Sequence, residues 1–295
     1  MPCYNPLLAY RLDGKVTFNK PFVYAKGFNL PCGQCIGCRL SYSRQWAIRC
    51  VHEAQMHEHN CFITLTFSPE ELAKRQNPQS LDVAEFQRFM KRLRKKYGSG
   101  VRFFHCGEYG ELNKRPHYHA LLFGVDFSDR VLWSQRNGVK LYVSDNLSKL
   151  WPYGFSTIGD VTFESAAYCA RYVMKKIRGE AAEDHYMFTD MVTGEVSQVK
   201  PEYATMSRKP GIGKTWFDKY KSDVFPNDYC VIRGHEIRPP RYYETLLPEE
   251  ELAQLKEKRK EQAPEVYENY DERMDRLWVS QIVKEEALKR LIRDL

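Results

Sequence analysis

The sequence predicts an α+β protein with a ferredoxin-like (split βαβ) antiparallel sheet and helices. Three observations predict this class: a β-rich segment, an amphipathic helical segment after it, and two strand-like segments joined by a short polar connection. With 295 residues, of which 43% are hydrophobic, the chain is long enough for one large domain or two smaller ones. No apolar run reaches the roughly 18 residues that a membrane-spanning helix needs, so we expect no membrane association.

The first strand and the first helix have clear local signals. Residues 61–67 (CFITLTF) are rich in β-branched and aromatic residues and end at Ser68 and Pro69, which predicts a strand. Residues 82–97 predict a helix with Asp82 as N-cap and Glu85 in a capping-box-like position. The apolar positions of this helix recur at helical spacing: Phe86, Phe89, Met90, Leu93 and Tyr97. Its other face is basic: Arg88, Lys91, Arg92, Arg94, Lys95 and Lys96.

Residues 101–108 and 117–125 predict two strands of a hairpin, and residues 163–176 predict a second helix. The resulting order β-α-β-β-α is that of a split βαβ core. We therefore expect four regions. These are a cysteine-rich N-terminal module (1–60) that a bound metal ion stabilises, the core (61–180), an irregular extension (181–245), and a charged helical tail (246–295) interrupted near Pro264.

Charge is distributed unevenly along the chain. The first 180 residues carry 26 basic and 15 acidic side chains, whereas the remaining 115 carry 19 and 23. This bias indicates a polyanion partner for the first 180 residues, although a solvated basic surface would show it too. Nine cysteines without a secretion signal favour metal ligation or simple burial over a disulfide framework.

The motif His117-Tyr118-His119 stands at the start of a predicted strand. Alternate side chains of a strand share a face, so the two imidazoles project together and can hold one divalent ion. Because the hairpin returns the end of one strand to the start of the next, Glu108 is a candidate third ligand, with His105 as a rival. Two polar residues on a wet face are the simpler interpretation of an isolated match.

The helical segment 168–176 (YCARYVMKK) places Tyr168 and Tyr172 four residues apart, on one helix face. Lys175 and Lys176 follow on the same side, and a nearby cation helps a phenol to ionise and act as a nucleophile. Tyrosines at this spacing, taken alone, are usually packing residues.

Cys32, Cys35 and Cys38 follow a C-x2-C-x2-C pattern whose glycines allow tight turns around one ion. Tetrahedral zinc needs a fourth ligand, for which Cys3, Cys50, Cys61 and His52 are candidates. An iron–sulfur cluster or three free buried thiols are alternatives.

The segment Gly211–Thr215 ends like a phosphate-binding loop, but the earlier glycine that this loop requires falls at Arg208. The upstream segment EYATMSRKP does not have the pattern of a buried strand, so we do not predict an NTPase.

Three segments in one order, FITLTF, GEYGELNKRPHYHALLFG and YCARYVMKK, resemble the motifs of the HUH endonuclease superfamily. The segments MPCYNP, PCGQCIGCR and MSRKPGIGK are similar to those of the gokushovirus (microvirus) rolling-circle replication initiators, so the resemblance covers most of residues 1–217. It implies that residues 61–180 form an HUH nuclease core.

The resemblance also implies roles for single residues. His117, His119 and Glu108 would hold a catalytic Mg²⁺ or Mn²⁺, and Tyr168 and Tyr172 would be paired nucleophiles assisted by Lys175. The implied chemistry is cleavage of single-stranded DNA through a 5′-phosphotyrosine, which a second transfer reverses without ATP. We expect the DNA-contacting side chains to include three cations: Arg115, Arg171 and Lys176. The family-like start MPC makes Cys3 the expected fourth ligand of a structural Zn²⁺.

The implied partner is single-stranded DNA at a phage replication origin, with a host helicase and polymerase as further candidates, in the cytoplasm of the bacterial host. Two alternatives stay open. A His/His/Glu set also suits a zinc hydrolase, and a zinc-containing DNA-binding or regulatory protein would explain the cysteines and the charge.

Overall fold

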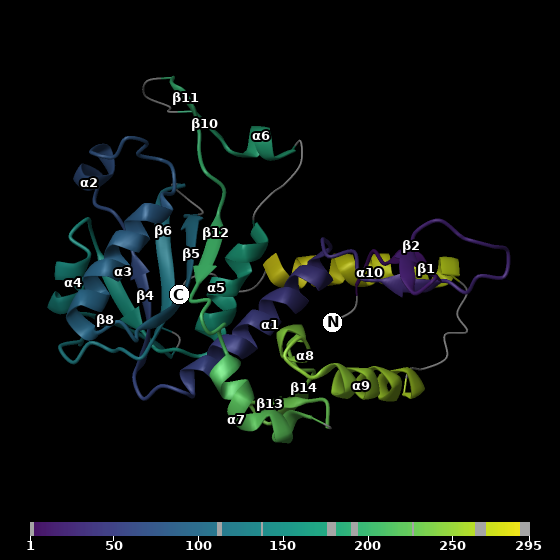
Figure 1. The fold of residues 1–295 in the computed structure, drawn as a ribbon. Helices are drawn as coiled ribbons and strands as arrows, with labels where there is room; N and C mark the ends of the chain where they lie inside the picture. The colour runs from purple at the N-terminus through teal and green to yellow at the C-terminus, as the bar shows by residue number, and fades with distance from the viewer. Residues whose placement is uncertain are drawn as a thin grey trace. The chain divides into compact units, whose positions relative to one another are not determined.

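The computed structural model describes residues 3–110, 114–136, 138–175, 181–189, 194–225, 227–262 and 270–289 (Figure 1). Of residues 172–175, 181, 270–272 and 289 it describes the backbone alone. The chain divides into two compact units, one made of residues 1–44 with 249–295 and the other of residues 45–248. Among the described residues, no helix is both long and apolar enough to cross a membrane.

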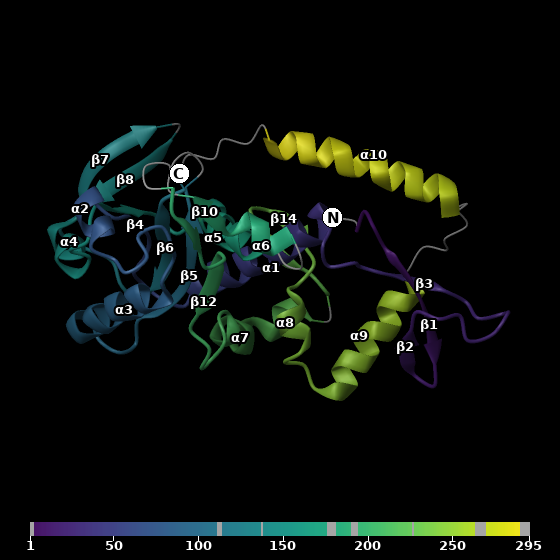
Figure 2. The ribbon, with the colours of Figure 1, turned by 90° about the horizontal axis from the view of Figure 1, so that it is seen from above.

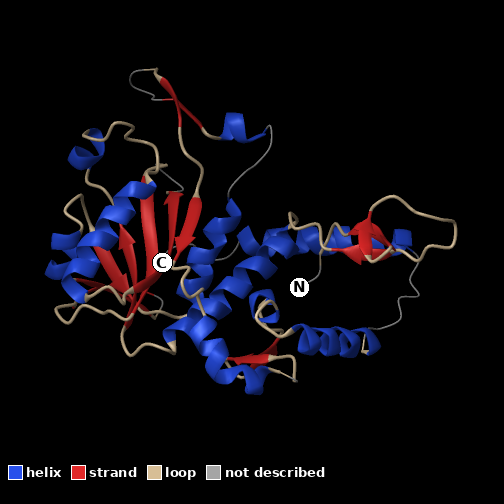
Figure 3. Ribbon diagram, viewed as in Figure 1, coloured by secondary structure: helices blue, strands red, loops and turns tan. Residues whose placement is uncertain are grey.

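The larger unit is built on a seven-stranded sheet in which every neighbouring pair is antiparallel (Figure 3). The strands follow in the order β12 (Tyr203–Met206), β5 (Arg102–Tyr109), β6 (Pro116–Phe123), β4 (Asn60–Leu65), β9 (Ser156–Gly159), β8 (Val139–Val143) and β7 (Val131–Arg136). The predicted α+β class with an antiparallel sheet is therefore confirmed.

Helices cover both faces of this sheet (Figure 2). On one face, α3 (Val83–Tyr97) and the short α4 (Asp145–Leu150) pack against the inward side chains of the central strands and form the main core. On the other face lies α5 (Phe163–Lys175), and α1 (Ile36–Ala54) brings Trp46 against Phe104 of β5. We call these the α3 face and the α5 face.

Shorter elements complete the larger unit. They are α2 (Pro69–Ala73), α6 (Ala181–His185), β10 (Met187–Thr189), β11 (Val196–Gln198), α7 (Lys214–Val224), β13 (Cys230–Ile232), β14 (His235–Ile237) and α8 (Arg241–Glu244). The smaller unit contains β1 (Leu7–Leu12), β2 (Lys15–Thr17), β3 (Phe28–Leu30), α9 (Glu249–Glu261) and α10 (Tyr270–Lys289).

The predicted strands and helices of the core are present with ends shifted by one or two residues. Between β6 and α5, however, the chain inserts β7, β8, α4 and β9, which the sequence pattern did not indicate. Nor did that pattern indicate α1 or the edge strand β12, whose four residues pair with β5 far away in the sequence.

The N-terminus of α3 corrects one expectation. Asp82 is the N-cap, and its side chain accepts a hydrogen bond from Ala84 N. Glu85 does not complete a capping box, because the N–H of Asp82 donates to the hydroxyl of Tyr118 instead. The Glu85 carboxylate is buried and receives two hydrogen bonds from Arg75, at 2.7 and 2.9 Å, and one from Tyr118.

Candidate functional site

The register of the central strands brings three predicted site residues to one face of the sheet. Glu108 in β5 lies directly opposite His117 in β6, and His119 lies opposite Cys106. Directly opposed residues of an antiparallel pair project to the same face, so Glu108, His117 and His119 all project to the α5 face.

Glu108 is the centre of this cluster. Its carboxylate oxygen Oε1 lies 2.7 Å from Nε2 of His119 and accepts a hydrogen bond of 3.2 Å from the hydroxyl of Tyr168 on α5. All three side chains are buried, and the rings of His119 and Tyr168 meet edge to face with centroids 5.0 Å apart. One carboxylate therefore joins two strands and a helix.

Thr64, in the neighbouring strand β4, was not singled out by its sequence. It lies opposite His119, and its hydroxyl is 3.0 Å from Nδ1 of that ring. Both ring nitrogens of His119 thus have partners, which fixes the ring in one orientation. The signal that could have identified Thr64 is the strand pairing, since a residue directly opposite His119 shares its face.

His117 sits at the rim of the cluster. A Cβ at Gly110 would lie 2.8 Å from Cε1 of the His117 ring, so only glycine permits this close approach. Nδ1 of His117 is buried and has no hydrogen-bond partner among the described residues. Burial, followed by the neighbouring His119, lowers the pKa of His117.

His105, the rival ligand, is on the wrong face. It lies opposite Ala120, stacks on Phe86 of α3 with ring centroids 3.5 Å apart, and contacts the hydroxyl of Thr205 at 3.0 Å. Because adjacent residues of a strand alternate, His105 belongs to the α3 core and does not share a site with His117 and His119.

Helix α5 carries the predicted nucleophiles. The guanidinium of Arg171 lies over the Tyr168 ring, 5.6 Å from its centroid, so a cation is close to this phenol. The backbone of α5 includes Tyr172 and Lys175, but their side chains lie outside the described residues, as does all of Lys176.

Of the other predicted DNA contacts, Arg115 is half-buried and donates a 3.2 Å hydrogen bond to the carbonyl of Phe67. The basic helix α3 covers the face opposite the Glu108 cluster. Two of its arginines, Arg92 and Arg94, donate to the carbonyls of Leu150 and Val101.

The loop that resembles a phosphate-binding loop holds a carboxylate of the protein itself. The N–H of Gly213, the N-cap of α7, donates a 2.6 Å hydrogen bond to Oε2 of Glu53. Arg102 forms an ion pair with the other oxygen of Glu53. Burial raises the pKa of this carboxyl, but the contacts with His57, Gly213 and Arg102 outweigh it and lower the pKa.

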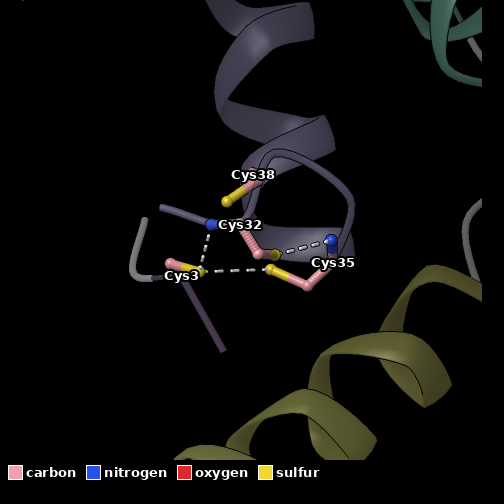
Figure 4. A group of neighbouring side chains, drawn as sticks. All are labelled: Cys3, Cys32, Cys35 and Cys38. Atoms are coloured by element: carbon pink, nitrogen blue, oxygen red, sulfur yellow. Dashed lines mark hydrogen bonds between the residues drawn. The ribbon is translucent and has the colours of Figure 1, made fainter. Parts of the chain in front are cut away.

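The four cysteines expected to bind zinc lie together in the smaller unit (Figure 4). Among the described residues they are the one group of three or more possible ligands whose atoms all lie within 4.8 Å of one another. Sγ of Cys3 and Sγ of Cys35 are 3.8 Å apart. This matches the separation of about 3.8 Å expected for two sulfurs at tetrahedral zinc with bonds of about 2.3 Å.

Backbone N–H groups point at these sulfurs. Cys32 N donates to Cys3 Sγ at 3.2 Å, Cys35 N to Cys32 Sγ at 3.3 Å, and Tyr4 N to Cys35 Sγ at 3.3 Å. Burial opposes ionisation of Cys35, but backbone donors outweigh it and lower its pKa to about 6. Burial is the main cause that raises the pKa of Cys38 to about 12.

The other candidate fourth ligands lie elsewhere. Cys50 and Cys61 are buried free thiols. His52 is stacked on Trp216 with centroids 3.5 Å apart, and its Nδ1 lies 2.8 Å from the hydroxyl of Tyr243. The cluster that could bind a metal such as zinc is therefore Cys3, Cys32, Cys35 and Cys38.

Comparison with known proteins defines the class first. The family model "Replication-associated protein ORF2/G2P" matches residues 60–177, the segment that contributes Thr64, Glu108, the two histidines and Tyr168. A protein described as "Replication-associated protein VP4", from Bdellovibrio phage phiMH2K, is 33% identical over 257 residues, which cover 83% of this chain and 76% of that protein.

The ORF2 replication-associated protein of Spiroplasma virus 4 is 32% identical over 295 residues, covering 89% of this chain and 87% of the relative. The ORF4 replication-associated protein of Chlamydia phage 1 is 28% identical over 229 residues, covering 75% and 54%. No solved structure matches the chain. The chain belongs to the replication-associated protein ORF2/G2P family of microviruses, which confirms the family that its motifs resemble.

Proposed function

We propose that this protein is a metal-dependent, HUH-type endonuclease and strand transferase. It nicks and rejoins single-stranded DNA through tyrosine nucleophiles, and so initiates and terminates rolling-circle replication of a small phage genome. The observation that carries the proposal is the contact of one buried carboxylate, Glu108, with both His119 and Tyr168. The relatives' description as replication-associated proteins supports DNA as the substrate.

The topology supports the finer fold assignment, with residues 61–180 as the nuclease core. The strands β5, β6, β4 and β9 stand side by side in that order, and α3 links β4 to β5. The chain continues from β6 through the hairpin β7–β8 and the helix α4 to β9, and both helices contribute to the core on one face. This is the β-α-β-β-α-β sequence of a split βαβ fold with one inserted hairpin.

Two donors of the Glu108 cluster, Glu108 and His119, lie as close together as two ligands of one divalent cation. Two ligands in adjacent positions of an octahedral ion with bonds of about 2.1 Å are about 3 Å apart, and Nε2 of His119 lies 2.7 Å from Oε1 of Glu108. Thr64 contacts the other nitrogen of His119, as outer contacts of metal-bound histidines do. No nitrogen of His117 lies within 4.8 Å of both Glu108 Oε1 and His119 Nε2. Nδ1 of His117 is nevertheless buried and has no hydrogen-bond partner among the described residues.

When bound, such an ion would neutralise charge that develops on the scissile phosphate and orient it. Tyr168 supplies the attacking oxygen, which forms a bond to phosphorus while the bond from phosphorus to the 3′ oxygen breaks. The proton of the phenol has an acceptor in Glu108 Oε1, at 3.2 Å, and the leaving 3′ oxygen takes a proton from water. The guanidinium of Arg171 over the Tyr168 ring favours the phenolate electrostatically.

A second nucleophile allows a second transfer. Tyr172 follows Tyr168 by one helical turn of α5. Lys175 is the third residue of this helix to which we assign a role in catalysis. Two tyrosines that act in succession would cut the displaced strand and close it into a circle. Arg115, Arg171 and Lys176 are the proposed contacts to the phosphates of the strand.

The test is adduct formation with single-stranded circular microvirus DNA, detected as a covalent protein–DNA species on a denaturing gel. Each single change, Tyr168→Phe or Tyr172→Phe, should leave adducts through the remaining tyrosine but prevent completion of a round, and the double variant should form none. Lys175→Ala should slow the reaction without abolishing it, because the lysine assists the attack but is not itself attacked.

Peptide mapping of the adduct decides the assignment, since DNA attached to any other residue would overturn it. The same gel separates the alternatives. A zinc hydrolase or a non-enzymatic zinc-containing DNA-binding protein would form no covalent species with DNA under any metal condition.

We further propose that the four-cysteine cluster holds a structural Zn²⁺. Four thiolates in a closed set leave no position for substrate, which is typical of structural rather than catalytic zinc. Metal analysis of freshly purified, reduced protein should find zinc, whereas an iron–sulfur chromophore or the absence of metal would contradict the proposal.

A further inference from the structure

Two exposed aromatic side chains lie together at the far side of the seven-stranded sheet. Trp133 in β7 is 62% exposed and Phe155, directly before β9, is 48% exposed, although their ring centroids lie 5.4 Å apart. The neighbours Val131 and Leu132 are exposed as well. A cluster of large apolar side chains on the surface marks an interaction site more often than a random surface does.

This cluster shares the α5 face with the Glu108 site. The backbone N–H of Thr66 donates to the carbonyl of Phe155 at 2.9 Å, which continues the β4–β9 ladder two residues beyond the pair Thr64–Thr157. Side chains two residues apart on a strand share a face, so Phe155 projects on the side of Thr64 and therefore of His119. With about 4.8 Å between neighbouring strands, Phe155 is about 10 Å across the sheet from the strand of His119.

The hairpin that carries Trp133 is basic. Residues 131–143 include no acidic residue, and Arg136 and Lys140 are both exposed. Tyr142 lies opposite Ile158 of the main core, so alternation places Lys140 on the α3 face, and it places Val139 with its partner Arg136 on the α5 face. The preceding Arg130, by contrast, is engaged by Asp126 and Asp160 at 3.0 and 3.5 Å. Exposed aromatic rings beside exposed cations are the combination that single-stranded nucleic acid binding uses, since bases stack on the rings and phosphates meet the cations.

We propose that Trp133 and Phe155 form a stacking platform for one base of the single-stranded DNA substrate, with Arg136 at its phosphates. The inference rests on the proposed function for its substrate class and adds a second contact region to it. Phe155 is also offset from His119 by two residues along the strands, about 7 Å, so the two are about 12 Å apart. A stacked strand advances about 3.4 Å per nucleotide, which places Phe155 about three to four nucleotides from the reacting phosphodiester. Since every base has a π face, the platform supplies affinity and strand position rather than sequence recognition.

The experiment measures binding of a fluorescein-labelled oligothymidylate of about 12 nucleotides by anisotropy. Trp133→Ala should weaken binding about 5- to 150-fold, the cost of losing one base–aromatic stack, and Trp133→Phe should restore most of it. The matched control is Trp278→Ala on α10, because Trp278 is 63% exposed and lies in the other unit. That variant should bind within about twofold of wild type. Equal affinities of Trp133→Ala and wild type would overturn the platform.

Two further measurements make the test specific to stacking on single strands. A duplex of the same length should bind Trp133→Ala and wild type alike, because its bases are already stacked; a loss equal to that for the single strand would contradict the proposal. Replacing Arg136 by glutamine should lower the slope of log affinity against log salt by about 0.7, the value of one phosphate contact, and Lys140→Gln on the α3 face should leave the slope unchanged. An unchanged slope for Arg136→Gln would remove this residue from the interface.

The alternative to DNA at the Trp133–Phe155 patch is a second copy of this chain, bound through the edge strand β7, and the test must detect it. If wild type dimerises in sedimentation and Trp133→Ala is a monomer with unchanged DNA affinity, the patch is a protein interface and the proposal is wrong. Adduct formation at saturating DNA separates this inference from the proposed function. If wild type forms adducts and Trp133→Ala binds DNA as tightly as wild type, only the platform is refuted. If Trp133→Ala binds DNA more weakly but wild type forms no adducts, only the nuclease is refuted.

Discussion

Replacement of Glu108 tests the centre of the proposed site in a way that separates folding from chemistry. Glu108→Ala removes the acceptor of the Tyr168 hydroxyl and the partner of His119 Nε2, both of which are buried. A hydrogen bond to a charged group contributes about 1.5–3 kcal/mol, so the loss of two of them predicts a loss of about 3–6 kcal/mol in the free energy of unfolding. This is a large share of the roughly 5–15 kcal/mol typical of a whole domain.

Glu108→Gln provides the contrast, because it keeps an oxygen of the same reach but removes the negative charge. Exchanging a charged for a neutral acceptor predicts a loss of only about 1–2 kcal/mol. Adduct formation should nevertheless disappear, since an amide neither accepts the phenol proton nor attracts a divalent ion as a carboxylate does.

Urea unfolding followed by circular dichroism measures the first effect and the denaturing gel measures the second. The control is Glu58→Ala, since Glu58 is exposed and its loss should change stability by no more than about 0.5 kcal/mol. If Glu108→Ala were as stable as Glu58→Ala, the buried contacts to His119 and Tyr168 would be absent. If Glu108→Gln formed adducts at the wild-type rate, the carboxylate would have no part in the reaction.

Three further predictions concern the ions and a buried histidine. Chelation of zinc should unfold the N-terminal cysteine module before the sheet domain, measured by proteolysis, because ligation contributes folding free energy directly; simultaneous loss of both would contradict this. His117→Ala with His119→Ala should abolish adducts while single-strand affinity stays within a few-fold, because phosphate contacts supply most of that affinity; undiminished adduct formation would remove the metal role. Burial lowers the pKa of His52 to about 3 in the folded state, against about 6.5 unfolded. The unfolded state therefore binds more protons below about pH 6.5, so stability should fall by about 2 kcal/mol between about pH 7 and pH 5. His52→Phe should lose this dependence, and an unchanged slope in that variant would assign the pH effect to other groups.

The parts of the fold that local patterns determine were predictable. The helix at Val83–Tyr97 has a clear apolar stripe and an aspartate cap, and the strand period alone places His117 and His119 on one face. The short connection between β5 and β6 is enough to predict that Glu108 lies beside the histidines. In each case the residues that decide the geometry lie within a few positions of one another.

What long-range packing determines was not predictable. Alternation along β5 already separates His105 from Glu108, which is three positions away, but the partners of His105 are Phe86 of α3 and Thr205 of β12, which no nearby pattern indicates. Glu85 has the spacing of a capping-box residue, yet Arg75 and Tyr118 hold it in the core. No pattern near position 85 encodes these two partners.

The helix that carries Tyr168 shows how a local signal can set the geometry of the whole site. α5 starts four residues after β9 ends, and its first turn is fixed by reciprocal hydrogen bonds. Thr162 N donates to Ser165 Oγ at 2.8 Å, and Ser165 N donates to Thr162 Oγ1 at 3.2 Å. Because the rotation of a helix follows from where it begins, this pair determines that the side chain at 168 projects toward the sheet. A shift of one residue at the cap would turn it by about 100° and break its contact with Glu108. The cap therefore sets which face of α5 presents Tyr168, and the β5–β6 register sets where Glu108 and His119 meet it.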